Sequence, residues 1–265
     1  MIPLKDDLPT ERMPLVTIAI IAINVVVFLV GWFHHVPTSD GPVRTNDLWA
    51  LEYGLFPCEL IHDCKGRHDV PIVYQRPNHD GHAGEVVKVP DRPAILTILT
   101  STFLHGGWAH LIFNMLFFWI FGNNVEDSMS RPRFALFYLL GAVISALGQA
   151  LPDLHSVVPQ IGASGAIAAC IGAYLVLYPR VHILTLVMLP LFGFLVRVPA
   201  LIIAGLWGVG QFVSSMQSLY GPSTGGGVAY MAHLTGFLGG ALLIKLFCRP
   251  KESYARLYEE HRRYV

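Results

Sequence analysis

The chain has 265 residues with 18 basic and 18 acidic side chains, so its formal net charge is zero. Hydrophobic residues make up 53% of the chain and charged residues only 14%, and the mean hydropathy is +0.51. Soluble globular domains carry about 25% charged residues, so this composition excludes an ordinary soluble protein. Zero net charge also gives no reason to expect nucleic acid as a partner.

Six segments are long and apolar enough to cross a bilayer as helices, since a span needs about 20 apolar residues and lipid offers the backbone no hydrogen-bond partners. This pattern predicts an all-α, polytopic membrane protein. In chain order the segments are residues 14–33, 102–122, 134–152, 160–178, 198–216 and 228–248. No small-residue cleavage pattern follows the first segment, so we expect a retained span and not a signal peptide.

Residues 183–196 form one further apolar stretch, flanked by Arg180 and Arg197 and containing Pro190. As a helix this stretch would reach only about 21 Å across a hydrocarbon core of about 30 Å. We therefore expect an interfacial or re-entrant connection there.

Basic residues in short loops favour the cytoplasmic side of a membrane. The loop 123–133 and the connection 179–197 carry arginines, whereas the alternate loops 153–159 and 217–227 carry neither Lys nor Arg. We therefore expect both termini on the cytoplasmic side, with the long loop 34–93 outside.

This orientation predicts three parts: a cytoplasmic N-terminus (1–13), a membrane domain (14–248) that includes the external loop, and a cytoplasmic tail (249–265). The external loop is rich in Pro, His and Gly, so we expect an irregular cap. It contains Cys58 and Cys64, whose spacing with nearby histidines fits no standard zinc site. A local disulfide and two unpaired thiols both remain open, and we expect no metal.

Polar side chains occur at corresponding positions of three predicted spans. The second span carries His105, His110 and Asn114, of which the last two share one helix face as i and i+4. The fourth begins near Ser164, and the sixth carries His233 near its start. Because these spans run from outside to inside, four of these groups are expected roughly 5–15 Å below the outer surface: those of His110, Asn114, Ser164 and His233. Polar groups inside a membrane are costly, so each is a functional candidate.

These residue types together predict acyl-transfer chemistry. A serine such as Ser164 becomes a nucleophile when a neighbouring base such as His233 removes its proton. The resulting oxyanion needs preorganised donors, which the side chains of His110 and Asn114 and the Ser164 backbone amide can supply. No carboxylate is placed to orient the histidine, since Asp153 lies before the fourth span. The sequence therefore predicts a Ser–His dyad.

Small residues surround both catalytic candidates. Gly162 and Gly165 let the backbone and a substrate approach the serine closely. Gly236 and Gly240 form a small-xxx-small face on the sixth span. We expect this face to pack on the fourth span, where Gly172 offers a matching small residue, and so to bring the histidine to the serine.

The chain resembles the rhomboid family through three motifs on its second, fourth and sixth spans: His110-x-x-x-Asn114, Gly162-x-Ser164-Gly165 and Ala232-His233-x-x-Gly236. Gly-x-Ser-Gly alone is a weak signal, but the three motifs in this order are specific. The resemblance covers residues 14–248 and implies a six-helix bundle with a long external loop between helices 1 and 2.

The resemblance also implies roles for individual residues and a class of substrate. Rhomboid proteases cleave single-pass membrane proteins within or beside their transmembrane segment. By resemblance the nucleophile is Ser164, the base is His233, and His110 and Asn114 line the oxyanion hole. Supporting positions are His105, Gly162, Gly165 and Gly236, and Glu126 matches a structural element at the inner end of the second span.

Two features depart from well-known family members. Ala168 stands where some members carry an aromatic residue that stacks on the catalytic histidine, so another side chain is expected to pack on His233. The external loop is longer, contains two cysteines and lacks an obvious Trp-Arg pair.

A second function stays open, namely a proteolytically inactive rhomboid-like chaperone or trafficking factor. Inactive relatives typically lack the serine or the histidine, and this chain keeps both. Transport by buried histidines is disfavoured because the two halves of the chain do not mirror each other. There is no His-Glu-x-x-His motif and no pair of intramembrane aspartates. We expect no cofactor, transmembrane proteins and the lipid bilayer as partners, and a location in the cell (inner) membrane; the sequence does not fix the oligomeric state.

Overall fold

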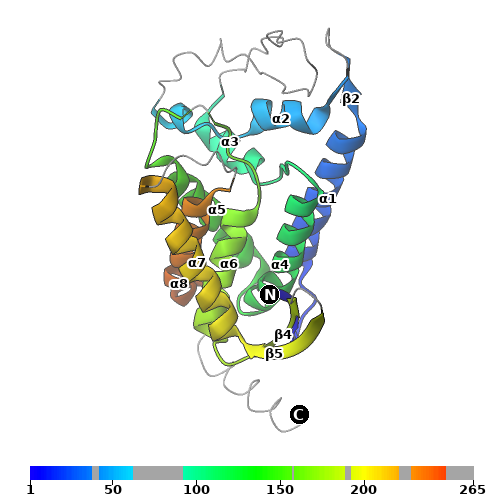
Figure 1. The fold of residues 1–265 in the computed structure, drawn as a ribbon, viewed down its shortest axis with the longest axis vertical. Coiled ribbons are helices and arrows are strands. Elements are labelled where there is room, and N and C mark those ends of the chain that lie inside the picture. Colours follow the sequence, from blue (N-terminus) through cyan, green and yellow to red (C-terminus); the bar gives the residue numbers. More distant parts are fainter. Residues whose placement is uncertain (38–41, 62–91, 157, 189–191, 221–227, 249–265) are drawn as a thin grey trace. The chain divides into compact units, whose positions relative to one another are not determined.

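The structure is a computed structural model that describes residues 1–37, 42–61, 92–156, 158–188, 192–220 and 228–248 (Figure 1). The chain forms two compact units. The first unit comprises residues 1–22, 112–149 and 163–265, and the second comprises residues 23–111 and 150–162. Each unit is described by itself below.

Helices dominate the described part of the chain. They are α1 (Leu15–Phe33), α2 (Thr45–Tyr53), the 3-10 helix η1 (Pro57–Ile61), α3 (Ala94–Ser101), α4 (Trp108–Asp127), α5 (Arg131–Ala150), α6 (Ser164–Leu177), α7 (Ala200–Tyr220) and α8 (Tyr230–Phe247). The strands are β1 (Ile2–Asp6), β2 (His35–Val36), β3 (Val43–Arg44), β4 (His182–Met188) and β5 (Gly193–Pro199).

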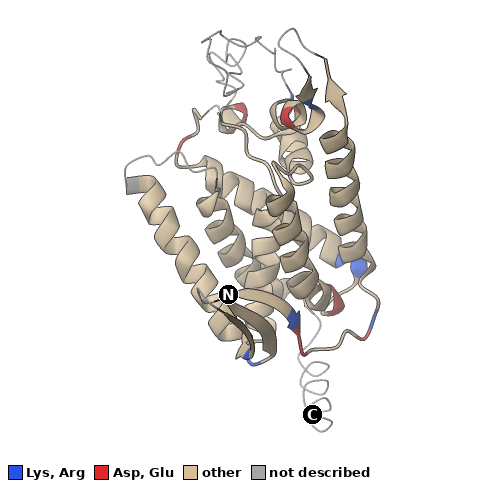
Figure 2. Ribbon diagram, turned by 45° about the vertical axis from the view of Figure 1, so that its right-hand side comes forward, with Lys and Arg blue, Asp and Glu red and all other residues tan. Residues whose placement is uncertain are grey.

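Each of the six apolar segments predicted from the sequence contains a helix. Among the described residues, four helices are long and apolar enough to cross a membrane, namely α1, α5, α7 and α8. The helix α6 is apolar but has only 14 residues. In the long apolar helices, charged residues occur only toward the helix ends, as the coloured ribbon of Figure 2 shows. The polytopic helical class is confirmed, whereas the count of six spans stays a prediction.

Two predicted helix starts are wrong by several residues. The second span was expected from residue 102, but α4 begins only at Trp108, because the Gly106-Gly107 pair before it disfavours a helix. The fourth span was expected from residue 160, but α6 begins at Ser164. Gly162 has a φ of 118°, a backbone conformation that a right-handed helix cannot include.

The first unit contains a three-stranded antiparallel sheet in the order β1-β4-β5. Strands β4 and β5 form a hairpin in which His182 pairs with Pro199 and Met188 with Gly193. Strand β1, from the predicted N-terminal segment, pairs with β4, with Ile2 opposite Leu186. Within the apolar stretch, residues 183–188 and 193–196 are therefore extended strands, which satisfy their backbone groups by strand pairing and need no helical length.

Helix α6 is the most enclosed element of the first unit. Every residue from Gly165 to Tyr174 is buried. Helix α7 instead leaves a broad apolar face uncovered, formed by Leu201, Ile202, Leu206, Val209, Phe212 and Val213. An apolar face of this kind is suited to lipid, because hydrocarbon chains solvate it without the cost that water imposes.

The N-terminal segment is tied to the end of α4 by polar contacts. The Glu126 carboxylate accepts hydrogen bonds from the backbone amides of Val16 and Thr17, at 3.0 and 2.8 Å, and from the Thr17 hydroxyl at 2.8 Å. It thereby caps the start of α1, whose first amides have no partner within the helix. The Arg12 guanidinium also pairs with Asp127 at 3.2 Å.

The second unit contains helical structure where the sequence analysis expected an irregular loop. Helices α2 and η1 and the strand pair β2-β3 all lie within residues 34–93. The buried Glu59 carboxylate joins η1 to α3, because it accepts hydrogen bonds from the Phe56 amide at 3.1 Å and the Thr97 hydroxyl at 2.8 Å. Cys58 is buried and disulfide-bonded, whereas Cys64 lies outside the described residues.

Candidate active site

Ser164 and His233 meet in the first unit. Ser164 is the first residue of α6, and His233 lies in the first turn of α8. The His233 Nε2 atom is 2.8 Å from the Ser164 Oγ atom, which is hydrogen-bond distance for a hydroxyl and an imidazole. Both side chains are half-buried. The pair therefore has the geometry that a serine nucleophile and its general base require.

Glycines let α6 and α8 approach closely enough for this contact. A Cβ atom on Gly236 would collide with the backbone carbonyl oxygen of Gly165, and one on Gly240 would collide with that of Ala169. On α6, Gly172 faces the backbone of α8 in the same way. These contacts occur between the faces that the small-residue pattern of the sequence indicates, and they fix His233 beside the start of α6.

A glutamine from a third helix holds the start of α8. The Gln149 side-chain oxygen, on α5, accepts a hydrogen bond of 2.9 Å from the backbone amide of Ala232. The first amides of a helix lack partners within the helix, and the residue before α8 provides no side-chain cap. Gln149 therefore caps α8 directly beside the histidine.

Two residues of α7 surround the histidine ring. The Gln211 Oε1 atom lies 2.8 Å from His233 Nδ1. The Trp207 ring is tilted by 36° toward the imidazole, with 5.9 Å between the ring centroids. Ala168 is buried near Gly236, so the aromatic neighbour of the histidine comes from α7 and not from the position of Ala168.

Donors for an oxyanion lie at two places in the first unit. At the start of α6, no side chain caps the helix, and the first hydrogen bond back to residue Ala163 comes from Ile167. The amides of the first turn, including that of Ser164, have no partner within the helix, and the helix dipole favours negative charge there. Asn114 is 7% exposed, and its Nδ2 atom has no hydrogen-bond partner among the described residues.

The remaining predicted residues belong to the second unit. The rings of His105 and His110 pack edge to face with their centroids 4.9 Å apart. His105 is only 2% exposed, so this contact supports the His110 ring from one side. The Gly162 amide donates a 2.8 Å hydrogen bond to the Ser101 carbonyl, which holds the turn that precedes α6. The oxyanion-hole assignment of His110 and Asn114 stays a prediction.

Comparison with known proteins identifies the family. A family model described as the rhomboid domain matches residues 92–250, more than half of the chain. The chain belongs to the rhomboid family. The resemblance inferred from the three motifs is thereby confirmed, and this rhomboid protein, with its several apolar helices, is an integral membrane protein.

Three relatives illustrate the extent of the similarity. The rhomboid protein is 41% identical over 78 residues to "Rhomboid protease GluP" of Bacillus subtilis (strain 168), which covers 29% of this chain and 15% of that protein. It is 28% identical over 162 residues to "Putative rhomboid protease YdcA" of the same organism, covering 58% of this chain and 68% of the relative. It is 29% identical over 156 residues to "Rhomboid protein 1, mitochondrial" of Saccharomyces cerevisiae, covering 56% of this chain and 40% of the relative.

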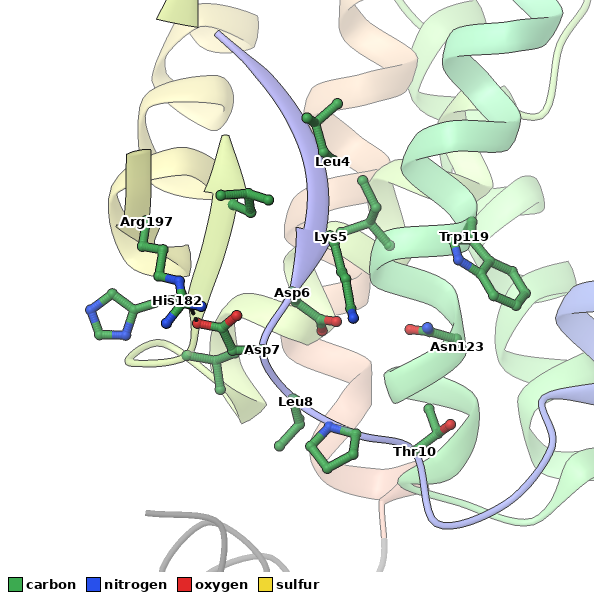
Figure 3. A pocket seen from close by; sticks show the side chains of 14 residues that line it. Leu4, Lys5, Asp6, Asp7, Leu8, Thr10, Trp119, Asn123, His182 and Arg197 are labelled. Carbon is green, nitrogen blue, oxygen red and sulfur yellow. Dashed lines mark ion pairs between the residues drawn. The ribbon is translucent and has the colours of Figure 1, made fainter. Parts of the chain in front are cut away.

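A pocket of about 910 Å³ lies elsewhere in the first unit of the rhomboid protein, beside β1 (Figure 3). In Figure 3, Lys5 and Asp6 project toward Asn123 of α4, and Asp7 faces Arg197 of β5 at 3.8 Å. Neither the serine nor the histidine lines this pocket. Its residues belong to the sheet end of the unit, so we do not assign the catalytic chemistry to it.

Sequence reasoning missed Gln149, Trp207 and Gln211. Both glutamines stand inside apolar segments, and a polar side chain within a span is a signal of function or of helix contacts. That signal was present in the sequence. It does not reveal which helix each amide faces, because that depends on how the helices are rotated about their axes.

Within the described residues, no group of three His, Cys, Asp or Glu side chains is arranged to hold a metal ion.

Proposed function

We propose that this rhomboid protein is an intramembrane serine endopeptidase that cleaves single-pass membrane proteins in or near their transmembrane segment. The observation that carries the proposal is the 2.8 Å separation between Ser164 Oγ and His233 Nε2. A hydroxyl buried among apolar helices ordinarily bonds back to a backbone carbonyl. Here it faces an imidazole, the group that can take its proton.

The reaction would proceed in two halves. His233 Nε2 accepts the Ser164 proton while Oγ attacks the scissile carbonyl carbon, which forms a tetrahedral oxyanion. The resulting imidazolium gives its proton to the leaving amine, and the C–N bond breaks to leave an acyl-serine. A water molecule, deprotonated by the same imidazole, then attacks the ester carbonyl. The imidazolium returns the proton to Oγ as the ester C–O bond breaks, which releases the carboxylic acid product and restores the free hydroxyl.

The oxyanion would be stabilised by hydrogen-bond donors of the backbone and of side chains. The Ser164 amide lies in the first turn of α6, where the helix dipole favours negative charge. The buried Nδ2 group of Asn114 has an open donor, and His110 is the further candidate. A fixed donor in a water-poor site is worth far more than one in bulk water, because the dielectric constant is low there.

We also propose that the protein resides in the cell membrane with both termini cytoplasmic, divided into residues 1–13, 14–248 and 249–265 as the loop charges predict. The basic residues of the loops 123–133 and 179–197 support this orientation. Some relatives have mitochondrial or chloroplastic names, so fractionation of the native membrane distinguishes the locations. Protease protection of tags at the two ends tests the orientation.

A covalent probe tests the catalytic proposal most directly. Purified protein in detergent is treated with a fluorophosphonate, which forms a stable bond to an activated serine, and the modified residue is identified by mass spectrometry. We expect labelling at Ser164 and its loss in Ser164→Ala, with cleavage of a single-pass substrate lost in parallel. Ser218→Ala is the matched control, because Ser218 is an exposed serine on α7. An inactive chaperone would show no labelling in any variant, and cleavage by Ser164→Ala would refute the mechanism.

A further inference from the structure

Gln211 makes the contact that the proposed Ser–His dyad does not account for. It lies in the middle of α7, between apolar neighbours, and is half-buried. Its side-chain oxygen is 2.8 Å from the Nδ1 atom of His233. Burying an amide among apolar helices costs free energy unless its polar atoms are hydrogen-bonded. The contact with His233 therefore offsets this cost for the glutamine and also gives the histidine a partner.

The contacts of the imidazole with Ser164 and Gln211 indicate where its proton lies. Ser164 must donate its hydroxyl proton to Nε2 for the nucleophile to be activated, so Nε2 must carry a lone pair. In a neutral imidazole the other nitrogen then carries the hydrogen. Nδ1–H can donate only to an acceptor, and the Gln211 oxygen is an acceptor at the right distance. The hydrogen bond therefore favours the tautomer that a general base needs.

We propose that Gln211 is a positioning residue that holds His233 in its reactive tautomer and orientation, so that the site works as a Ser–His–Gln chain. This inference rests on the proposed protease function. When the imidazole takes the serine proton, Nδ1–H remains bonded to the amide oxygen, whose dipole stabilises the imidazolium less strongly than a carboxylate would. A neutral amide also spares the membrane interior a buried charge.

Other contacts of α7 keep the glutamine in place. Trp207 lies one turn before Gln211 and packs against both His233 and Phe237, with centroid separations of 5.9 Å in each case. Gly208 also faces the Phe237 ring. The face of α7 that carries residues 207, 208 and 211 therefore lies on α8. As a consequence, any displacement of α7 away from α8 would release the histidine from its acceptor.

Two substitutions separate a tautomer-fixing role from simple packing. Gln211→Met keeps the length of the side chain but removes the acceptor. Gln211→Glu keeps the acceptor and adds a negative charge. Gln217→Met is the matched control, because Gln217 is an exposed glutamine of the same helix. The measurement is the pH dependence of kcat and kcat/KM for a single-pass substrate, with thermal unfolding of each variant recorded alongside.

For Gln211→Met we expect kcat on the plateau to fall by about 10- to 100-fold, which is the range of a lost hydrogen bond to an ionised group. The acid limb of the profile should move to lower pH, because the imidazolium loses an acceptor. For Gln211→Glu the acid limb should move to higher pH, because a carboxylate stabilises the imidazolium. KM should change little in either variant, and the control should stay within about twofold of wild type.

Three results would decide against the inference or against its basis. The inference is overturned if Gln211→Met has the same plateau kcat and the same acid limb as the wild type. It is also overturned if kcat falls but the acid limb stays at the same pH in both variants, since that result indicates packing alone. If one variant fails to fold, the pH position of the acid limb in the other variant decides whether the inference holds. Persistent cleavage by Ser164→Ala would instead refute the proposed protease function, a result that the Gln211 variants cannot produce.

Discussion

The polar side chains at the two ends of α6 have different kinds of hydrogen-bond partner. At its first residue, Ser164 has a half-buried hydroxyl whose partner is the imidazole of His233. Ten residues later, the Tyr174 hydroxyl donates a 2.6 Å hydrogen bond to the Asp6 carboxylate, which also accepts a 2.7 Å bond from Asn124. Asp6 is only 6% exposed.

This contrast separates a reactive polar group from a structural one on the same helix. At the Asp6 end the acceptor is saturated by donors, as buried polar groups require for stability. At the Ser164 end the partner is an imidazole, a group that can take a proton. Elsewhere in the first unit, the Nδ2 donor of Asn114 has no hydrogen-bond partner among the described residues. Burial alone therefore does not separate the proposed catalytic residues from structural ones, whereas the chemical nature of the partner does.

The comparison predicts its largest effect for His233, the proposed general base. His233→Ala should lower cleavage of a single-pass substrate by about 10⁴-fold or more, because removal of one member of such a pair disables the whole unit. Tyr174→Phe, at the other end of the helix, is the control and should keep activity within about tenfold while lowering the unfolding temperature. Substantial cleavage by a folded His233→Ala protein would remove the distinction between the two ends.

The second effect concerns the open donor. Asn114→Ala should lower kcat by about 10²- to 10³-fold if its amide stabilises the oxyanion, with little change in thermal stability since its Nδ2 group bonds to no described residue. Asn123→Ala, near the other end of α4, provides the matched control. An unchanged kcat in Asn114→Ala would show that the Asn114 amide does not stabilise the oxyanion.

Apolar runs, polar outliers and glycine spacing were enough to predict the helical class and the residues that meet at the start of α6. They do not predict the β1-β4-β5 sheet, because an apolar stretch such as 183–196 fits a hairpin and a membrane connection equally well. The role of Gln211 was also hidden, since it depends on the rotation of α7 about its axis. Likewise, nothing local to Asp6 predicts that it reaches Tyr174, 168 residues further along the chain.

The third effect tests the glycine contacts that bring α6 and α8 together. Gly240→Ala should lower the free energy of unfolding by about 1–3 kcal/mol, because the new methyl group would collide with the backbone carbonyl of Ala169, which cannot rotate away. Gly205→Ala on α7 is the control, since no atom lies within 4 Å of its added Cβ; it should be neutral or stabilising by up to about 1 kcal/mol. Equal stabilities of the two variants in detergent would show that α6 and α8 do not depend on this close approach.

The smallest effect on cleavage is expected at the Asp6 end of α6, where the effect appears as a pH dependence of stability. Burial raises the pKa of the Asp6 carboxyl from 3.8 to about 6, although the hydrogen bonds from Tyr174 and Asn124 act in the opposite direction. Since the folded state holds this proton more tightly than the unfolded state, the stabilising contribution of protonated Asp6 is complete below about pH 4. It is lost as the pH rises through 6, with a slope of at most about 1.4 kcal/mol per pH unit. Asp6→Asn should remove this slope, as measured by thermal unfolding between pH 4 and 7, while leaving the acid limb of the cleavage profile in place. If stability still depends on pH in Asp6→Asn, another group titrates between pH 4 and 7. If the acid limb of the cleavage profile moves in this variant, the two ends of α6 are coupled.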